Sequence, residues 1–289
     1  MKYILIILMV FMLSGPSHAT ELTIGLIPEQ NVFNQVARYK PLGEYIEKKT
    51  GIKMKFTILS RYGNIIENFY KKKLDGSFWG SFTGAMAMKK MDIQFLARPV
   101  NLDGNSTYHG YIFVRKNSGI RDVAGMKGRT IAFVEKATTA GYIFPMAYFK
   151  EHGVKNINTY FKEYYFAGSH DAAIYAVLNK KADIGCAKNS MFDMLAMNDP
   201  RIKEELVILA KSPVVPSNGL GVRKELAFGV KAEIKHALLE MDKDPEGREV
   251  LKKFGALRFV ETQESDYAPV FGIAEKAGIT LENYEYINK

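Results

Sequence analysis

The sequence has almost no cysteine, and its few histidines are scattered. One of its 289 residues is a cysteine, Cys186, so a disulfide within the chain is excluded. We expect Cys186 to be a small buried apolar residue. The histidines show no spacing typical of a metal site, and they are His18, His109, His152, His170 and His236. We therefore expect no metal, no cofactor and no catalytic residue.

Long apolar runs are absent after the N-terminal segment. The run from Tyr3 to Leu13 follows one lysine and precedes Ser17-His18-Ala19. This order of a positive residue, a short apolar run and small residues is typical of a secretory signal peptide, and the run is too short to span a bilayer. We expect residues 1–19 to be a signal peptide cleaved after Ala19, which would place the mature chain in the periplasm, outside the inner membrane.

The charge is positive, but the sequence lacks a basic-aromatic pattern. Lys and Arg number 40 against 31 Asp and Glu, which gives a formal net charge of +9. Such a balance favours an anionic ligand or an acidic partner surface. Nucleic acid is a poor candidate for a secreted chain without a recognisable binding motif.

Strand and helix patterns alternate along the chain in two series. The first series predicts strands at 21–27, 52–59 and 75–81, with helices between them. The second predicts strands at 108–114, 130–134, 161–166 and 182–186, with a helix at 172–181. This alternation predicts an α/β fold in which each half is a mostly parallel sheet flanked by helices, with ligands beyond the carboxyl ends of the strands.

The chain crosses between the two halves twice. One crossing is expected near 108–114, and the proline-rich stretch 212–220 predicts the second. Residues 20–110 and 215–289 would then form lobe I, and residues 111–214 would form lobe II, with a cleft between the lobes. Lobe I would end in a helical region at 224–254, interrupted at Asp244-Pro245, and a last helix near 267–277.

One strand–turn–helix segment, residues 128–145, combines hydroxyl groups with a predicted helix N-terminus. The apolar strand Thr130 to Val134 leads to Thr138-Thr-Ala-Gly141 and a helical pattern. Free backbone N–H groups at a helix start favour an anion. The two threonines can equally serve as ordinary N-caps. If Thr139 is the N-cap, Pro145 lies beyond the first turn of the helix, so the helix starts later or is bent.

The chain resembles the phosphate-, phosphite- and phosphonate-binding proteins of ABC importers, which are two-lobed periplasmic binding proteins of type II. The matching segments cover almost the whole chain after residue 19 in the expected order. They are Gly25-Leu-Ile-Pro-Glu29, Tyr39-Lys-Pro-Leu42, Thr50-Gly51, Tyr62, 75–82, Asn117-Ser-Gly-Ile120, Thr138-Thr-Ala-Gly141, Gly168-Ser-His-Asp171 and Lys211-Ser-Pro-Val-Val-Pro216.

The resemblance implies which residues bind the ligand. Thr138, Thr139 and the Ala140 amide would hold the oxygens of an oxyanion, and His170 would donate a hydrogen bond. Tyr62 and Tyr108 would contact the oxyanion from the facing lobe. Asn218 matches a position where members that bind alkylphosphonates can carry an acidic residue. From the residues alone, Tyr62 can as well pack under a helix, and His170 can be a capping or core residue. A raised pKa of His170 would make binding tighten as pH falls.

Two departures from the family pattern bear on the ligand. Ala140 replaces a serine of the usual turn and removes one hydroxyl. Ser190 stands where members that take up aminoalkyl phosphonates place a carboxylate, and a buried ammonium without a counter-charge is costly. The resemblance therefore implies a small oxyanion, namely phosphite, phosphate or a simple alkylphosphonate, with arsenic oxyanions still possible.

The expected partner is an ABC permease, and we expect a monomer. A sensory protein of the same fold, which reports an oxyanion to a membrane histidine kinase or chemoreceptor, is the alternative. A secreted phosphoryl hydrolase would need an activated nucleophile or a metal cluster, and neither pattern is present in the sequence.

Overall fold

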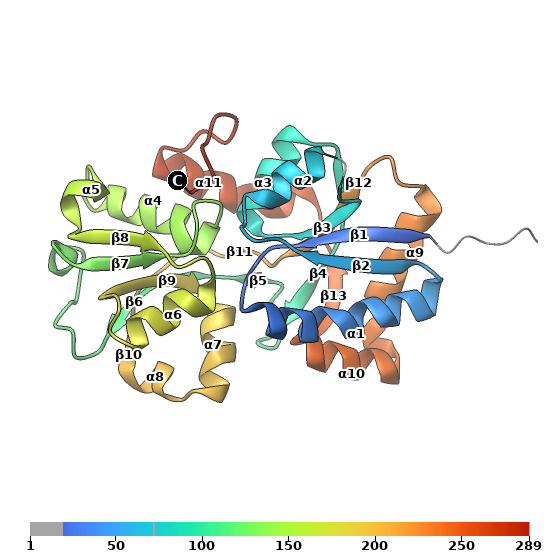
Figure 1. The fold of residues 1–289 in the computed structure, drawn as a ribbon, viewed down its shortest axis with the longest axis horizontal. Helices are drawn as coiled ribbons and strands as arrows, with labels where there is room; N and C mark the ends of the chain where they lie inside the picture. Colours follow the sequence, from blue (N-terminus) through green and yellow to red (C-terminus); the bar gives the residue numbers. More distant parts are fainter. Residues whose placement is uncertain (1–19, 72, 289) are drawn as a thin grey trace, which may run out of the picture.

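Two α/β lobes lie side by side along the long axis of the molecule (Figure 1). The computed structural model describes residues 20–71 and 73–288. The predicted signal peptide, residues 1–19, lies outside the described residues. Across the described part of the chain, no helix combines the length and apolar character needed to cross a membrane.

The sheet of lobe I is built from both ends of the chain. Its strands, in spatial order, are β13 (Ala256–Glu261), β4 (Ile93–Asn101), β12 (Gly219–Arg223), β3 (Gly76–Trp79), β1 (Glu21–Leu26) and β2 (Lys53–Ile58). Strand β1 pairs in parallel with β2 and β3, whereas β12 and β13 pair antiparallel with their neighbours.

The sheet of lobe II has the same mixed character. Its spatial order is β10 (Leu206–Lys211), β6 (Gly110–Arg115), β9 (Ile184–Lys188), β7 (Thr130–Phe133) and β8 (Glu163–Phe166). Strand β7 is parallel to β8 and β9, and β6 is antiparallel to β9 and β10.

The predicted α/β fold is confirmed, but the prediction of mostly parallel sheets was wrong. The strand–helix–strand alternation covers only β1 to β3 and β7 to β9, where the pairs are indeed parallel. Strands that follow a crossing between lobes, such as β6 and β12, enter their sheets in the opposite direction. No strand was predicted at β4 or β13, and no helix at α3 (Ser81–Lys90).

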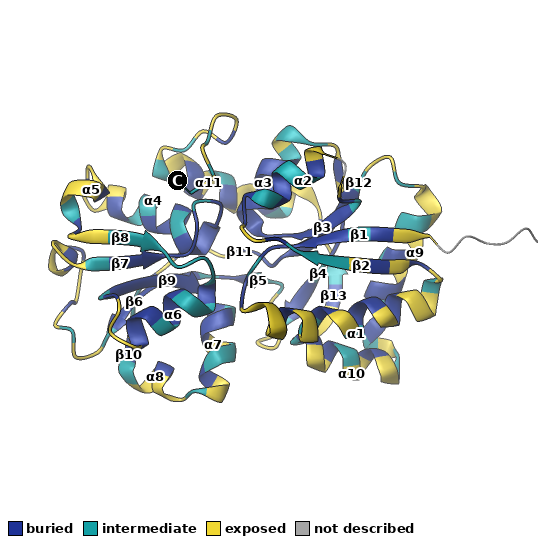
Figure 2. Ribbon diagram, viewed as in Figure 1, coloured by how far each residue is buried: buried dark blue, intermediate teal, exposed yellow. Residues whose placement is uncertain are grey.

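Helices cover both faces of the sheets, and the strands are largely buried while the outer faces of α1 and α10 are exposed (Figure 2). Lobe I carries α1 (Val32–Thr50), α2 (Asn64–Tyr70), α3, α9 (Phe228–Leu239) and α10 (Pro245–Phe254). Lobe II carries α4 (Phe144–Glu151), α5 (Ile157–Tyr160), α6 (His170–Leu178), α7 (Asn189–Asn198) and α8 (Arg201–Glu205). The last helix, α11 (Ala268–Ala277), packs against α4 of lobe II and α3 of lobe I.

A short ribbon joins the lobes in the middle of the molecule (Figure 1). Strand β5 (Thr107–Tyr108) pairs antiparallel with β11 (Val215–Pro216), so the two crossings run next to each other. Strand β6 of lobe II begins directly after β5. The division into 20–110 with 215–289 and 111–214 stays a proposal, and α11 contacts both lobes.

The predicted helix at Thr138–Gly141 begins with an unusual turn. Residues Thr139–Ile143 form a π-helical turn, and α4 follows directly from Phe144. Pro145 is therefore the second residue of α4, at the junction where the π turn passes into the regular α-helix. Gly141 is needed in the π turn, because a Cβ there would lie 2.4 Å from Val134 Cβ and 2.6 Å from the Thr138 hydroxyl.

Replacing Gly141 by alanine should therefore destabilise lobe II. We expect Gly141→Ala to lower the free energy of unfolding by about 1–3 kcal/mol, the usual cost of overpacking a rigid site. Gly125→Ala is the matched control, since its nearest neighbour would be 3.5 Å away. Urea unfolding of the three proteins measures the difference, and equal stability of both variants would contradict the packing account.

Candidate functional site

The π turn presents the amide groups of a helix N-terminus at the interface of the two lobes. The N–H groups of Thr139, Ala140 and Gly141 are the first of a continuous helical segment and have no acceptor one turn earlier. Thr138, Thr139 and Ala140 are all buried. Partial positive charge at such an end favours an anion.

A chain of hydroxyl groups connects this turn to lobe I. The Ser81 hydroxyl, at the start of α3, lies 2.6 Å from the Thr139 hydroxyl and 2.5 Å from that of Tyr108. Each hydroxyl can donate one hydrogen bond and accept others, so the chain can reorient to donate to an oxyanion. The three side chains are buried.

His170 lies at the first position of α6 and is held as a neutral ring. Its Nδ1 accepts a hydrogen bond from the Lys188 backbone N–H at 3.3 Å, so in the neutral ring the proton is on Nε2, which can donate. Burial, assisted by the Lys188 charge, lowers the pKa of His170 to about 3. The sequence left open a raised pKa. The structure shows the opposite shift, because the imidazole is buried beside a cation.

Tyr62 faces His170 edge to face, with ring centroids 6.1 Å apart. Its hydroxyl is buried and has no hydrogen-bond partner among the described residues. Burial raises the pKa of Tyr62 well above its ordinary value, so the phenol keeps its proton. A buried donor without an acceptor costs about 1–3 kcal/mol, so Tyr62 is suited to donate to a ligand oxygen.

A buried charged cluster lies beside these donors, and sequence analysis missed it. Lys188, at the end of β9, places its ammonium 2.5 Å from Glu29 Oε1 and 2.6 Å from Asn218 Oδ1. Arg38 lies 3.5 Å from the other oxygen of Glu29. Burial alone would raise the pKa of Glu29, but the charges of Lys188 and Arg38 outweigh burial and lower it to about 2. Two cations against one carboxylate leave this cluster positive.

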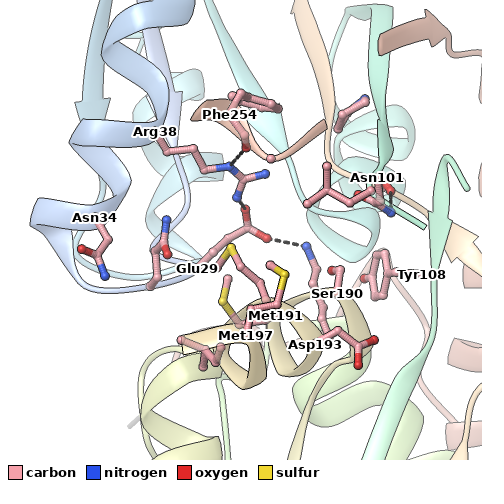
Figure 3. A pocket seen from close by; sticks show the side chains of 18 of the residues that line it. Glu29, Asn34, Arg38, Asn101, Tyr108, Ser190, Met191, Asp193, Met197 and Phe254 are labelled. Carbon is pink, nitrogen blue, oxygen red and sulfur yellow. Dashed lines mark hydrogen bonds and ion pairs between the residues drawn. The ribbon is translucent and has the colours of Figure 1, made fainter. Parts of the chain in front are cut away.

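An interlobe cavity of about 760 Å³ opens from the outer side of this cluster. Its lining includes Glu29, Tyr108, Lys188, Ser190 and Asn218. Figure 3 shows Glu29 and Arg38 on one side, with Ser190 and the methionines of α7, Met191 and Met197, on the other. The cavity is lined by both lobes.

The residues predicted from the sequence lie in one region, although some of their polar side-chain groups are already hydrogen-bonded within the protein. Ser81 links Tyr108 to Thr139, Tyr62 faces His170, and Lys188 contacts both His170 and the Tyr108 ring. The Thr138 hydroxyl donates to the Glu135 carbonyl oxygen at 2.6 Å and is therefore committed within the turn. Asn218 accepts from Lys188, and its buried Nδ2 has no partner among the described residues.

Four polar residues of this region were not predicted as ligand-binding residues from the sequence: Glu29, Ser81, Glu135 and Lys188. Each follows or ends a strand, since Glu29 comes after β1, Ser81 after β3 and Glu135 after β7, and Lys188 ends β9. Polar side chains at the carboxyl ends of parallel strands are a usable signal, because ligands bind there. The contacts that these side chains make across the lobes cannot be predicted from the local sequence.

Comparison with known proteins settles the family. A family model described as "ABC transporter, phosphonate, periplasmic substrate-binding protein" matches residues 24–267. The chain belongs to this family. Its members are binding proteins of ABC transporters in the periplasm, which agrees with the resemblance found in the sequence.

Individual relatives span nearly the whole chain. The phosphonates-binding periplasmic protein of Escherichia coli strain K12 is 27% identical over 271 residues, which cover 91% of this chain and 79% of the relative. A probable ABC transporter phosphite binding protein, PhnD1 of Prochlorococcus marinus strain MIT 9301, is 23% identical and covers 90% of this chain and 91% of its own.

Solved structures show the same fold. A binding protein component of an ABC phosphonate transporter from Pseudomonas aeruginosa has a TM-score of 0.83 at 21% identity, covering 90% of this chain and 87% of that one. PhnD1 from Prochlorococcus marinus, solved with methylphosphonate, has a TM-score of 0.80 at 22% identity, covering 90% and 99%. These likenesses confirm the fold of the periplasmic binding proteins.

Glu135 makes the stability of the protein depend on pH. Its carboxylate accepts a hydrogen bond from the Tyr62 backbone N–H of the facing lobe at 3.0 Å. Burial raises its pKa to about 7, although the Tyr62 N–H and the Arg61 charge oppose the rise. Stability from a raised carboxyl pKa is complete below the ordinary value and is lost as pH rises through the folded value, here about 7.

Between about pH 5 and pH 8 the wild type should therefore lose about 1–3 kcal/mol more unfolding free energy than Glu135→Gln, which cannot titrate. Urea unfolding at both pH values measures the two losses, and the comparison cancels the titration of all other groups. Parallel losses in the two proteins would show that Glu135 titrates normally.

Proposed function

We propose that this protein captures a small phosphorus oxyanion, namely phosphite, phosphate or an alkylphosphonate, between its lobes and delivers it to an ABC permease. One observation carries the proposal: donors from both lobes lie at two helix starts, where Tyr108 is linked through Ser81 to Thr139 of the π turn and Tyr62 faces His170 of α6. A phosphorus oxyanion requires several donors at short range, and this set supplies them.

The charges around the donors support the same ligand class. Glu29 and Lys188 are buried and Arg38 is half-buried, and together the three carry one positive charge in excess. In a site of low dielectric constant this charge attracts an anion far more strongly than it would in water. The neutral His170 adds a donor without adding a second buried charge.

Transport fits the family better than sensing does. The family model and the two relatives named above are described as transporter binding proteins or periplasmic binding proteins. A permease gene and an ATPase gene beside the gene of this protein are the expected neighbours. A histidine kinase gene in their place would favour the sensory alternative.

The arrangement also supports binding without catalysis. The donors around Thr139 can hold oxygens, but His170 is neutral and accepts at Nδ1 from a backbone N–H, so it lacks the carboxylate partner of an activating base. Release of phosphate from generic phosphate esters by the purified protein would overturn this part of the proposal.

Calorimetric titration of the protein without its signal peptide tests the ligand class directly. Phosphite, phosphate and methylphosphonate form the test panel, and sulfate is the anion control. At least one of the three phosphorus oxyanions should bind more tightly than sulfate. If sulfate binds best, or if none of the panel binds, the proposed ligand class is wrong.

Two substitutions test the proposed donors. Thr139→Ala and His170→Gln should each weaken binding of the preferred phosphorus oxyanion by about 1–3 kcal/mol, the cost of losing a hydrogen bond to a charged group. The matched controls are Thr159→Ala and His152→Gln, which change exposed residues of the same lobe. Calorimetry measures all four variants, and wild-type affinity in both site variants would place the ligand elsewhere.

A further inference from the structure

The ammonium of Lys188 is the most completely enclosed cation of the described residues around the cleft. Only 6% of the residue is exposed. The Nζ atom donates to Glu29 Oε1 at 2.5 Å and to Asn218 Oδ1 at 2.6 Å, and it lies 4.6 Å from the ring centroid of Tyr108. Two acceptors and an aromatic face surround it, which is the environment that proteins use to recognise an ammonium group.

This ammonium lies directly beside the proposed oxyanion donors. The Lys188 backbone N–H donates to His170 Nδ1, and the Tyr108 ring beneath its ammonium belongs to the hydroxyl chain that ends at Thr139. Lys188 also lines the interlobe cavity, together with Ser190 and Asn218. A substituent on the bound phosphorus atom that pointed toward this cavity would meet Nζ of Lys188.

We propose that Lys188 acts as a built-in ammonium that fills the place of a ligand's own ammonium and so determines specificity. The inference rests on the proposed function, because it concerns the substituent of a bound phosphorus oxyanion. The cleft would accept phosphite, phosphate and uncharged alkylphosphonates, and it would reject aminoalkyl phosphonates. The rejected ligands would bring a second ammonium close to the first, and the Glu29 and Asn218 oxygens at this place already accept from Lys188.

Charge repulsion gives the expected direction of this selectivity. Two like charges in neighbouring positions repel more strongly at the effective dielectric constant of a partly buried site than they do in water. Ser190 offers a hydroxyl but no compensating charge. The unpartnered Nδ2 of Asn218 is a donor, and it also disfavours a cationic group.

An ion pair with a purely structural role would give a different result when Lys188 is removed. In Lys188→Ala the oxygens of Glu29 and Asn218 lose their ammonium partner, while the space of the lysine side chain becomes free. An aminoalkyl phosphonate could then supply the missing ammonium. A purely structural lysine would instead leave all ligands weakened to the same extent.

The test compares two ligands that differ mainly in charge, 2-aminoethylphosphonate and propylphosphonate. Calorimetry should show that the wild type binds propylphosphonate at least about 10-fold more tightly. In Lys188→Ala the ratio of the two affinities should shift by at least about 10-fold toward 2-aminoethylphosphonate. The control is Lys253→Ala, which removes an exposed lysine that lines the same cavity, and it should keep the wild-type ratio.

The outcomes separate this inference from the proposed function. If the wild type binds methylphosphonate but does not distinguish 2-aminoethylphosphonate from propylphosphonate, the inference is wrong, and the wild-type result decides this even if Lys188→Ala does not fold. A folded Lys188→Ala variant with an unchanged ratio also overturns it. If the wild type binds none of phosphite, phosphate and methylphosphonate, the proposed function fails first and the inference falls with it.

Discussion

A buried ion pair across the two lobes is the interaction on which the cleft depends. Glu29 follows the first strand of lobe I, and Lys188 ends a strand of lobe II, so their contact exists only when the lobes are together. Desolvation makes such a pair expensive, and a buried pair is weak evidence for stability. The pair matters because of its position: it places a positive charge where the two lobes meet and aligns the lobes with each other.

Other contacts also join residues of opposite lobes near the ends of their strands and helices. The Tyr62 N–H reaches Glu135, the Ser81 hydroxyl reaches Thr139, and the His170 N–H reaches the Glu29 carbonyl oxygen at 3.3 Å. All of them involve residues at strand ends or helix starts, which are rigidly placed. A two-lobed protein with an adjacent pair of crossings can open as a hinge, and a ligand that binds both lobes favours the closed state by its differential affinity.

Sequence patterns predicted the elements near the site better than the sheets. The run from Thr130 through the Thr138–Gly141 turn was placed correctly, because apolar β-branched residues, small residues and a later helical pattern are local signals. The mixed direction of the sheets was not predictable in the same way, since the direction of β12 depends on a return from the other lobe. Strand β4 lacks the flanking pattern of the parallel strands and was missed.

The same distinction holds for the site. Thr139 and His170 belong to short motifs that a family resemblance can identify, and the structure links Thr139 through Ser81 to Tyr108. Glu29 and Lys188 are 159 positions apart, so nothing local in the sequence indicates their contact. The neutral state of His170 is likewise a product of burial, which sequence alone does not reveal.

The most direct measurement of the central claim is a crystal structure of the protein with methylphosphonate. The account predicts that the phosphorus group lies between the lobes within hydrogen-bond distance of the Thr139 hydroxyl, the Ala140 amide and His170 Nε2, and that the Lys188 ammonium stays paired with Glu29. A phosphorus group in the outer cavity among the methionines of α7, with no contact to Thr139 or His170, would contradict it.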